Sequence, residues 1–523
     1  MRQLHAARRR LAVPYPPARD PARASPEEAA VTHRHGAAQP DAVAHHTVDE
    51  VPERARHGCT RDLFTLGFGT HIAPLALVTG AMAVQVFHQP LWSGVLAVLV
   101  GQLLGGVFMA PHRAPGPQFG LPQLIRSRAR SGSLGALPGV VVAAALYVTF
   151  FAAHLVLAGK SLHVLTPGLP VGAGILLGAA GSALLCLTGH RLIHALNKVA
   201  AVVLGLGLVA GLALAVTRGL PGDFFTRGGF TFAGWLAIVS LSALWQPALA
   251  PYAADRSRAL PGTVRTTATF WATYGGACLG SLLPFLAGAA VAPACPGPDT
   301  GAGIGGAAGS FGPVLLVLFL FSVLHHNALN LYRAVQATLT IGQTLRTHWQ
   351  PRPRVRGAVS ALVLACGPAL ALGLAGDFVT RFADLVLVLL AALVPWAAIN
   401  LVDFSLLRHG SQDPDELCDP DDAPYRRFDP VALGSYVLGI AVQIPFLAGD
   451  LYTGPPAAHF GGADLSWLVG PAVTAPLYFL WARSRLRRCE GGAVLGMREQ
   501  AARILDPLRP LYPEDVRGFA DTR

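Results

Sequence analysis

The sequence predicts an all-α integral membrane protein, and three observations support this fold class. Of its 523 residues, 52% are hydrophobic and 13% are charged, and the mean hydropathy is +0.47, values unusual for a soluble domain of this length. Apolar stretches of about 20 residues, the length that crosses a bilayer, recur along the chain. Two of them, 63–87 and 232–254, are interrupted by glycine or proline. Such a pair of interrupted spans indicates a transporter built from inverted repeats.

Twelve transmembrane helices are expected within one permease domain, residues 63–483. They lie at 63–87, 91–110, 137–159, 169–188, 198–217, 232–254, 271–292, 313–341, 357–375, 382–407, 431–453 and 465–482. Cytoplasmic loops of membrane proteins carry the excess of Lys and Arg. If the N-terminus is inside, the inner loops hold most of these residues. The outer loops hold only Lys160, Arg218, Arg227 and Arg381. We therefore expect a multi-pass protein of the plasma membrane with both termini in the cytoplasm.

The two ends of the chain are expected to be tails. Residues 1–62 mix Arg, Pro, Ala and His without apolar periodicity, which predicts a disordered cytoplasmic N-terminal tail. Residues 484–523 are expected to form a cytoplasmic C-terminal tail. The net charge of +11 then reflects topology and contact with anionic membrane lipid, rather than nucleic-acid binding.

The first interrupted span contains Gly67, Gly69 and Pro74, with His71 among them. Irregular backbone persists at membrane depth only where protein or a water-filled cavity satisfies its polar groups. We therefore expect a broken helix around a site. In the sixth span Gln246 precedes Pro247, whose missing N–H frees a carbonyl. This break could present an amide side chain to a ligand, or it could be a tolerated proline kink.

Polar side chains inside the other spans give further candidates. In the third span Phe150 and His154 are four residues apart, so they share a helical face. A ring beside a hydrogen-bonding group suits a flat heterocycle, although core packing is the alternative. In the eighth span Asn330 lies on a polar stripe, and its amide matches the mixed donor and acceptor edge of an amide-containing ring.

Histidine is the titratable residue available at mid-depth, because no carboxylate falls there in the first, third, sixth or eighth span. The candidates are His71, His154, His325 and His326, and each could instead be structural. The sequence has no nucleotide-binding or hydrolase motif and no metal-type cluster of ligands. Neither an enzyme nor a nucleotide-driven pump is expected, which leaves a secondary carrier, a channel or a sensor.

Four strings resemble the bacterial cytosine/purine permeases of the nucleobase:cation symporter-1 family. They are GPQFGLPQLIRSRARSGSLGALPGVV from Gly116, APYAADRSRALPG from Ala250, PWAAINLVDFSLLRHG from Pro395 and GGADLSWLVG from Gly461. The resemblance implies the leucine-transporter fold: two inverted five-helix repeats with discontinuous helices 1 and 6, plus two peripheral helices. It also implies a substrate site between the first, third, sixth and eighth spans, and transport by alternating access.

The resemblance assigns roles to individual residues. Phe150 matches the family's stacking tryptophan, and His154 matches an Asn or Gln. His71 falls where the family has an asparagine, Leu249 where many members have a tryptophan, and Asn330 matches the substrate-binding asparagine. With Gln246 from the sixth-span break, the expected substrate-binding residues are His71, Phe150, His154, Gln246, Leu249 and Asn330.

The same comparison changes the expected coupling ion. The hydroxyl pair of the family's sodium site falls at Leu324 and His325. Leucine offers no oxygen to a hard cation, and neutral imidazole prefers softer metals. We therefore expect proton rather than sodium coupling, with the cation or proton held near Gly69, Thr70, Ala73 and His325, and no cofactor or bound metal.

The sequence thus predicts a symporter that imports a nucleobase-type heterocycle, cytosine or a purine. Allantoin or hydantoin, a thiamine-related pyrimidine and a pyridine vitamer remain alternative substrates. A receptor or regulator that kept a carrier's scaffold without transporting is the alternative class. The expected partners are a small heterocycle and membrane lipid but no nucleic acid, and the protein is expected to be a monomer or weak oligomer.

Overall fold

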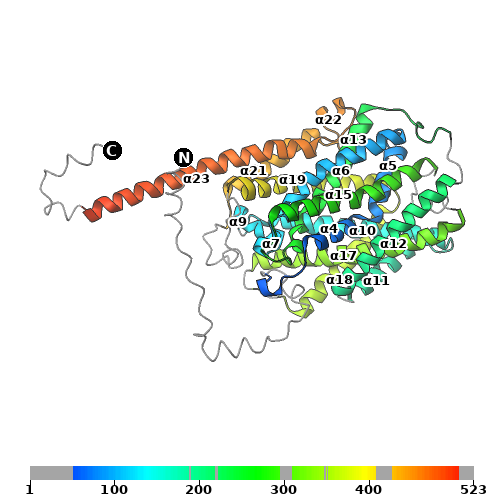
Figure 1. The fold of residues 1–523 in the computed structure, drawn as a ribbon, viewed down its shortest axis with the longest axis horizontal. Coiled ribbons are helices and arrows are strands. Elements are labelled where there is room, and N and C mark those ends of the chain that lie inside the picture. The colour runs from blue at the N-terminus through cyan, green and yellow to red at the C-terminus, as the bar shows by residue number, and fades with distance from the viewer. Residues whose placement is uncertain are drawn as a thin grey trace. The chain divides into compact units, whose positions relative to one another are not determined.

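The computed structural model describes residues 51–132, 134–187, 190–217, 222–294, 309–346, 349, 351–407 and 427–505. These residues belong to one unit, His46–Arg523, and fold into helices (Figure 1). The β-structure among them is an isolated bridge between Ala448 and Thr453. This agrees with the all-α membrane fold expected from the sequence.

A helix occupies each of the predicted stretches. The long helices are α4 (Thr60–His71), α5 (Pro74–Gln85), α6 (Leu91–Arg113), α10 (Leu137–Leu165), α11 (Val171–Leu187), α12 (His190–Thr217), α13 (Phe232–Trp245), α15 (Thr266–Val291), α17 (Gly312–Leu345), α18 (Pro353–Leu374), α19 (Phe378–Val402), α21 (Pro430–Gln443) and α23 (Ser466–Leu505). Short helices connect or extend them: η2 (Glu53–Ala55), α7 (Gly116–Phe119), α8 (Gln123–Arg126), α9 (Arg128–Ser131), η3 (Pro247–Tyr252), α14 (Ala254–Ser257), η4 (Ala292–Ala294), η5 (Gly309–Phe311), η6 (Asp403–Leu407), η7 (Ile444–Phe446) and α22 (Pro455–His459).

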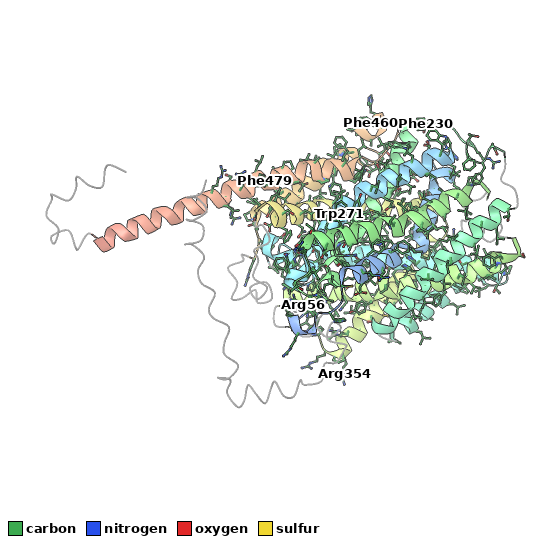
Figure 2. All side chains as sticks on the ribbon, in the orientation of Figure 1. Arg56, Phe230, Trp271, Arg354, Phe460 and Phe479 are labelled. Carbon is green, nitrogen blue, oxygen red and sulfur yellow. The ribbon has the colours of Figure 1, made fainter. Side chains whose placement is uncertain are left out.

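Not all of these helices qualify as membrane spans by length and composition. Among the described residues, 7 helices are long and apolar enough to cross a bilayer alone, and the pair α4 and α5 raises the number to 8. Three shorter apolar helices are Val171–Leu187, Val199–Leu214 and Pro430–Phe446. The arrangement is consistent with twelve spans and with an inverted repeat, which both stay predictions. Figure 2 labels Trp271, whose side chain is 64% exposed on α15, as expected of a lipid-facing residue.

The predicted break in the first span is confirmed, and the sixth span changes from α-helix to 3₁₀ helix at the predicted position. Helices α4 and α5 meet at a bend of 57°, and Ala73 between them has extended backbone (φ −111°, ψ 140°). Pro74 explains the break, because a proline disfavours helical backbone at the preceding residue and lacks the N–H that would continue the helix. In the sixth span α13 ends at Trp245, and Pro247 begins the 3₁₀ helix η3.

The interior is built around two helix groups. Helix α10 packs against α11, α17, α18 and α19, while α15 packs against α4, α5 and α6 (Figure 1). Glycines allow the second group to approach backbone to backbone. A Cβ on Gly80 of α5 would overlap the carbonyl oxygen of Phe285 in α15, and a Cβ on Gly288 would overlap that of Leu77. Small residues at such contacts let membrane helices pack closely.

Gly80→Ala is accordingly expected to destabilise the protein by about 1–3 kcal/mol, the usual cost of overpacking a close contact. The measurement is the thermal unfolding temperature in detergent. Gly357→Ala is the matched control, because nothing lies within 4 Å of a Cβ there. A glycine in an open helix position gains helix propensity on conversion to alanine, so the control should be neutral or slightly stabilising. Equal effects of the two changes would contradict the packing argument.

The N-terminal boundary differs from the predicted one. Val51 is fully buried, and its N–H donates to the carbonyl of Gly120 (3.1 Å). The guanidinium of Arg56 donates to the carbonyl of Pro117 (2.8 Å), and the His57 N–H donates to that of Ala259 (2.7 Å). Residues 51–62 of the predicted tail are therefore packed, because hydrogen bonds to the backbone hold a segment without apolar periodicity. Residues 1–50 of the predicted tail lie outside the described residues.

The C-terminal boundary falls inside a helix. Helix α23 continues to Leu505, so the segment after residue 483, expected to be a tail, begins as a helical extension of the last span.

Candidate functional site

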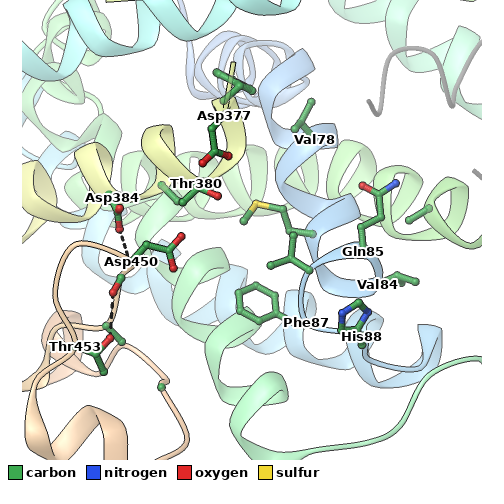
Figure 3. A pocket seen from close by; sticks show the side chains of 18 of the residues that line it. Val78, Val84, Gln85, Phe87, His88, Asp377, Thr380, Asp384, Asp450 and Thr453 are labelled. Atoms are coloured by element: carbon green, nitrogen blue, oxygen red, sulfur yellow. Dashed lines mark hydrogen bonds between the residues drawn. The ribbon is translucent and has the colours of Figure 1, made fainter. Parts of the chain in front are cut away.

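A wide pocket opens at one end of the helices, between α5, α10, α19 and the segment that joins α21 to α23 (Figure 3). We call it the outer pocket, and its volume is about 990 Å³. Lys160 of α10 and Arg227 line it, and the sequence predicts that both lie outside the membrane on the extracellular side. The pocket therefore opens at the face predicted to be extracellular.

A second, deeper pocket of about 150 Å³ continues inward from the outer one. The two share lining residues that include Met82, Phe87 and Asp384. Four aromatic side chains line the deeper pocket: Phe87, Phe150, Trp245 and Phe382. Concave sites with aromatic walls and few polar groups are typical of small-molecule binding.

The helix break at α13 positions the aromatic walls. Trp245 is the last residue of α13, and its ring centroid lies 6.5 Å from that of Phe150 on α10, at an interplanar angle of 50°. Phe382 of α19 lies 6.2 Å from Phe150 on another side. Trp245 Nε1 has no hydrogen-bond partner within the described chain. A flat ring entering this pocket would meet Phe150 and Trp245 and find an unused indole N–H.

His154 and Asn330 meet beside this pocket, between α10 and α17. His154 Nδ1 donates to the carbonyl of Phe150 one turn earlier (2.8 Å), and Asn330 Nδ2 lies 3.4 Å from the same nitrogen. The rings of His154 and His326 are stacked, with centroids 6.2 Å apart and planes 6° apart. We call His154 and His326 the histidine pair.

The histidine pair presents two unused nitrogens. His326 Nδ1 donates to the carbonyl of Ser322 (2.9 Å), in the same manner as His154 Nδ1. A carbonyl only accepts hydrogen bonds, so each Nδ1 carries a proton and each Nε2 is an acceptor when the ring is neutral. Both Nε2 atoms are buried and have no hydrogen-bond partner among the described residues. His325 is buried at right angles beside His326, with ring centroids 5.6 Å apart.

The residues expected around the cation lie at the end of α4 and at the break. Gly69 and His71 are buried, and His71 Nδ1 donates to the carbonyl of Gly67 (2.7 Å). The Thr70 hydroxyl donates to the carbonyl of Leu66 (2.8 Å), and the backbone of Thr70 faces the His326 ring. Ala73 is the extended residue that precedes α5. The end of the broken helix therefore adjoins the histidine pair.

Gln246 faces away from the deeper pocket. Its Nε2 donates to Gln102 Oε1 on α6 (2.8 Å) and to Ser281 Oγ on α15 (2.9 Å). Leu249 is partly buried in η3. Of the six expected substrate-binding residues, Phe150 lines the deeper pocket, while His154 and Asn330 meet beside it.

The sequence reasoning missed Trp245, although an aromatic residue directly before a proline break was a usable signal. Asp384, which the sequence did not single out as a site residue, lines both pockets. Asp403 accepts a hydrogen bond from Tyr478 of α23 (2.9 Å) and so joins two helices.

Away from the outer pocket, polar contacts join the helices from the break in the first span toward the opposite end. Arg256 Nη1 of α14 donates to Thr70 Oγ1 of α4 (3.0 Å), and Arg113 Nε of α6 donates to the carbonyl of Ala253 (2.9 Å). The Tyr252 hydroxyl donates to the carbonyl of Arg333 on α17 (3.1 Å). These contacts join helices from both sides of the interior, and we call them the inner closure. The two pockets thus open on the side away from these contacts.

Thr70→Val should loosen the inner closure. It removes one hydrogen bond to a charged group, worth about 1.5–3 kcal/mol, so amide exchange along α4 should rise roughly 10- to 150-fold. Hydrogen–deuterium exchange of residues 60–71 measures this. Thr65→Val is the matched control, because the Thr65 hydroxyl bonds only locally to the Asp62 carbonyl. If both variants exchange like the parent, the Arg256 contact does not hold α4.

Comparison with known proteins gives consistent results. Residues 50–470 match the family described as permeases for cytosine/purines, uracil, thiamine and allantoin. The chain is 34% identical over 453 residues to YxlA of Bacillus subtilis, which is provisionally named a purine-cytosine permease, covering 86% of this chain and 98% of the relative. It is 25% identical over 329 residues to the purine-cytosine permease FCY21 of Saccharomyces cerevisiae, covering 60% of each.

Among solved structures the fold resembles that of Mhp1, a nucleobase-cation-symport-1 family transporter solved in a closed conformation with bromovinylhydantoin bound. The TM-score is 0.65 at 18% sequence identity, covering 84% of this chain and 95% of Mhp1. The structural likeness establishes the fold, and the sequence match extends over most of the described helices. The chain therefore belongs to the family of permeases for cytosine, purines, uracil, thiamine and allantoin.

Proposed function

We propose that this protein imports a nucleobase-type heterocycle, cytosine or a purine, by proton-coupled alternating access across the plasma membrane. One observation carries the proposal within this family of permeases. A deeper pocket walled by Phe150 and Trp245 shares its lining with the pocket at the face predicted to be outside, while the inner closure joins the helices on the other side. This arrangement corresponds to a carrier whose substrate pocket is accessible from outside the cell.

The pocket suits a flat heterocycle. Aromatic side chains stack on planar rings, and Phe150 and Trp245 approach from different elements. The Trp245 N–H and the amide of Asn330 are candidate partners for the edge of the ring. His154 and Asn330 meet one turn from Phe150, so small movements of α10 or α17 would bring them to the substrate.

The coupling ion in this proposal is a proton held by the histidine pair. His154 keeps an unused acceptor nitrogen, and His326 faces the backbone of the broken first span at Thr70. Binding a proton there would place a charge between α10 and α17, next to the break end of α4, which Arg256 contacts at Thr70. Leu324 supplies no oxygen to a sodium ion, which favours the proton over sodium.

Competition uptake tests the proposed substrate class. Cells that lack endogenous nucleobase permeases would express the full-length chain and receive labelled cytosine or adenine. Saturable accumulation, competed by unlabelled nucleobases, is the expected result. Allantoin, hydantoin, thiamine and pyridoxine are the comparison solutes, and accumulation of one of these without any nucleobase would overturn the proposed substrate.

A further inference from the structure

The charged residues described in the lining of the deeper pocket are all acidic. Asp384 and Asp464 are the charged residues among its described lining, whereas Lys160 and Arg227 line the outer pocket alone. The remaining walls are aromatic, aliphatic or neutral polar. A ligand that has passed the outer pocket therefore meets two carboxylates and no basic side chain from the described part of the chain.

Asp384 is placed so that part of its carboxylate stays available. It lies near the start of α19, its side chain is more than nine-tenths buried, and Oδ1 accepts the N–H of Asp450 (2.8 Å), as Figure 3 shows. That N–H is its hydrogen-bond partner within the described chain, and an ionised carboxylate has room for about four. Capacity to accept hydrogen bonds therefore remains at a residue that lines both pockets.

A short hairpin fixes the position of Asp384. Residues 447–454 fold back on themselves through the Gly454 N–H to Leu447 carbonyl bond (2.9 Å) and the Gly449 N–H to Tyr452 carbonyl bond (3.0 Å). A Cβ on Gly449 would overlap Asp384 Oδ1, so a larger residue there would have to displace the carboxylate. The hairpin thus holds one oxygen of Asp384 and lines the passage beside it.

Asp464 supplies the second carboxylate, from the segment just before α23. It is 8% exposed and accepts the N–H and the hydroxyl of Ser466 (3.2 and 3.1 Å). Burial raises the pKa of Asp464 to about 6, so the group is ionised at neutral pH. It therefore adds negative charge on the hairpin side of the deeper pocket.

Two neutral groups in the same pocket lack partners. The Ser240 side chain is 1% exposed, and its hydroxyl has no hydrogen-bond partner among the described residues. The Trp245 N–H is likewise unpaired. Buried polar atoms are normally satisfied, so unpaired ones in a pocket lining point to a ligand that completes them.

We propose that Asp384, supported by Asp464, accepts the exocyclic amino group of the substrate and makes the carrier selective for amino-substituted heterocycles over their oxo counterparts. This inference rests on the proposed function and narrows its substrate class. Cytosine and adenine carry such an amino group, whereas uracil and hypoxanthine carry a carbonyl oxygen at the same ring position. An ionised carboxylate only accepts hydrogen bonds, so it pairs with the amino group and repels the carbonyl oxygen.

Competition constants for two matched pairs of bases test this proposal. Cytosine with uracil, and adenine with hypoxanthine, would compete against a labelled nucleobase that the parent protein transports. The amino member of each pair should compete better by about tenfold or more, as expected when a site rejects an analogue that leaves a buried group unpaired. Asp384→Asn keeps an oxygen for the hairpin N–H but adds a donor, so it should lower that preference roughly tenfold. Asp464→Asn should lower it less, because Ser466 already occupies that carboxylate.

Asp377→Asn is the matched control, because Asp377 precedes α19 and lines the outer pocket alone. The preference of this variant for the amino base over the oxo base should equal that of the parent. A ratio of competition constants does not depend on how much protein folds, so reduced expression would not obscure the result. If nucleobases compete but the pairs are not discriminated, or if Asp384→Asn and Asp377→Asn behave alike, this proposal is overturned and the proposed function stands. If no nucleobase competes, the proposed function fails and the selectivity proposal fails with it.

Discussion

Phe150→Ala is expected to weaken nucleobase binding roughly 5- to 150-fold, because stacking of a base on an aromatic side chain is worth about 1–3 kcal/mol. Phe150 is the residue that sequence and structure both place in the pocket, where it faces Trp245 and Phe382. The measurement is the dissociation constant of labelled cytosine or adenine for the purified carrier. Phe150→Trp should retain most of the affinity, since an indole also stacks on a planar ring.

Phe230→Ala provides the comparison for that loss. Phe230 is 52% exposed and lines neither pocket, so the same chemical change there should leave affinity unaltered. Unchanged affinity in Phe150→Ala would show that the substrate does not bind against this wall.

The second large effect is expected at the histidine pair. In His154→Gln and His326→Gln the side chain stays polar but no longer titrates. Uptake driven by an inward proton gradient should therefore fall to the level reached without a gradient. With one proton per substrate, a gradient of one pH unit supports about tenfold accumulation. Exchange of labelled for unlabelled substrate at equal pH should persist, because it needs no net proton movement.

His163→Gln is the matched control for both variants. His163 is exposed near the outer end of α10, and its Nδ1 donates to the carbonyl of Leu169 (2.8 Å). Gradient-driven uptake should survive in this variant. If accumulation in His154→Gln and His326→Gln still follows the proton gradient, coupling occurs elsewhere.

The helix breaks were predictable because their causes are local. Pro74 and Pro247 remove backbone donors wherever they occur, and the chain around each cannot continue as a regular helix. The pairing of Phe150 with His154 also followed from helical spacing, and the Nδ1 contact to the Phe150 carbonyl agrees with it.

The direction of side chains at the breaks could not be predicted in the same way. Beyond a helix end the backbone no longer fixes which neighbour a side chain meets, so Gln246 turned toward Gln102 and Ser281 rather than the pocket. Trp245, one residue earlier, lines the deeper pocket instead.

The burial of residues by distant segments of the chain also could not be predicted from the sequence. Asp384 is buried because a hairpin more than 60 residues later packs against it, and the N–H of Asp450 satisfies one of its oxygens. Residues 51–59 resemble a tail in composition, yet Gly120 and Ala259 bind their backbone. Long-range contacts of this kind leave no periodic signal.

The most direct test of proton-coupled nucleobase import is accumulation by the purified protein in sealed proteoliposomes. Vesicles loaded at neutral pH would be diluted into acidic buffer, and the uptake of labelled cytosine or adenine would be measured. The comparison is uptake by vesicles that have an inward sodium gradient and no pH difference. The account predicts transient accumulation above the outside concentration with the proton gradient and none with sodium. Accumulation that requires sodium and ignores the pH difference would contradict it.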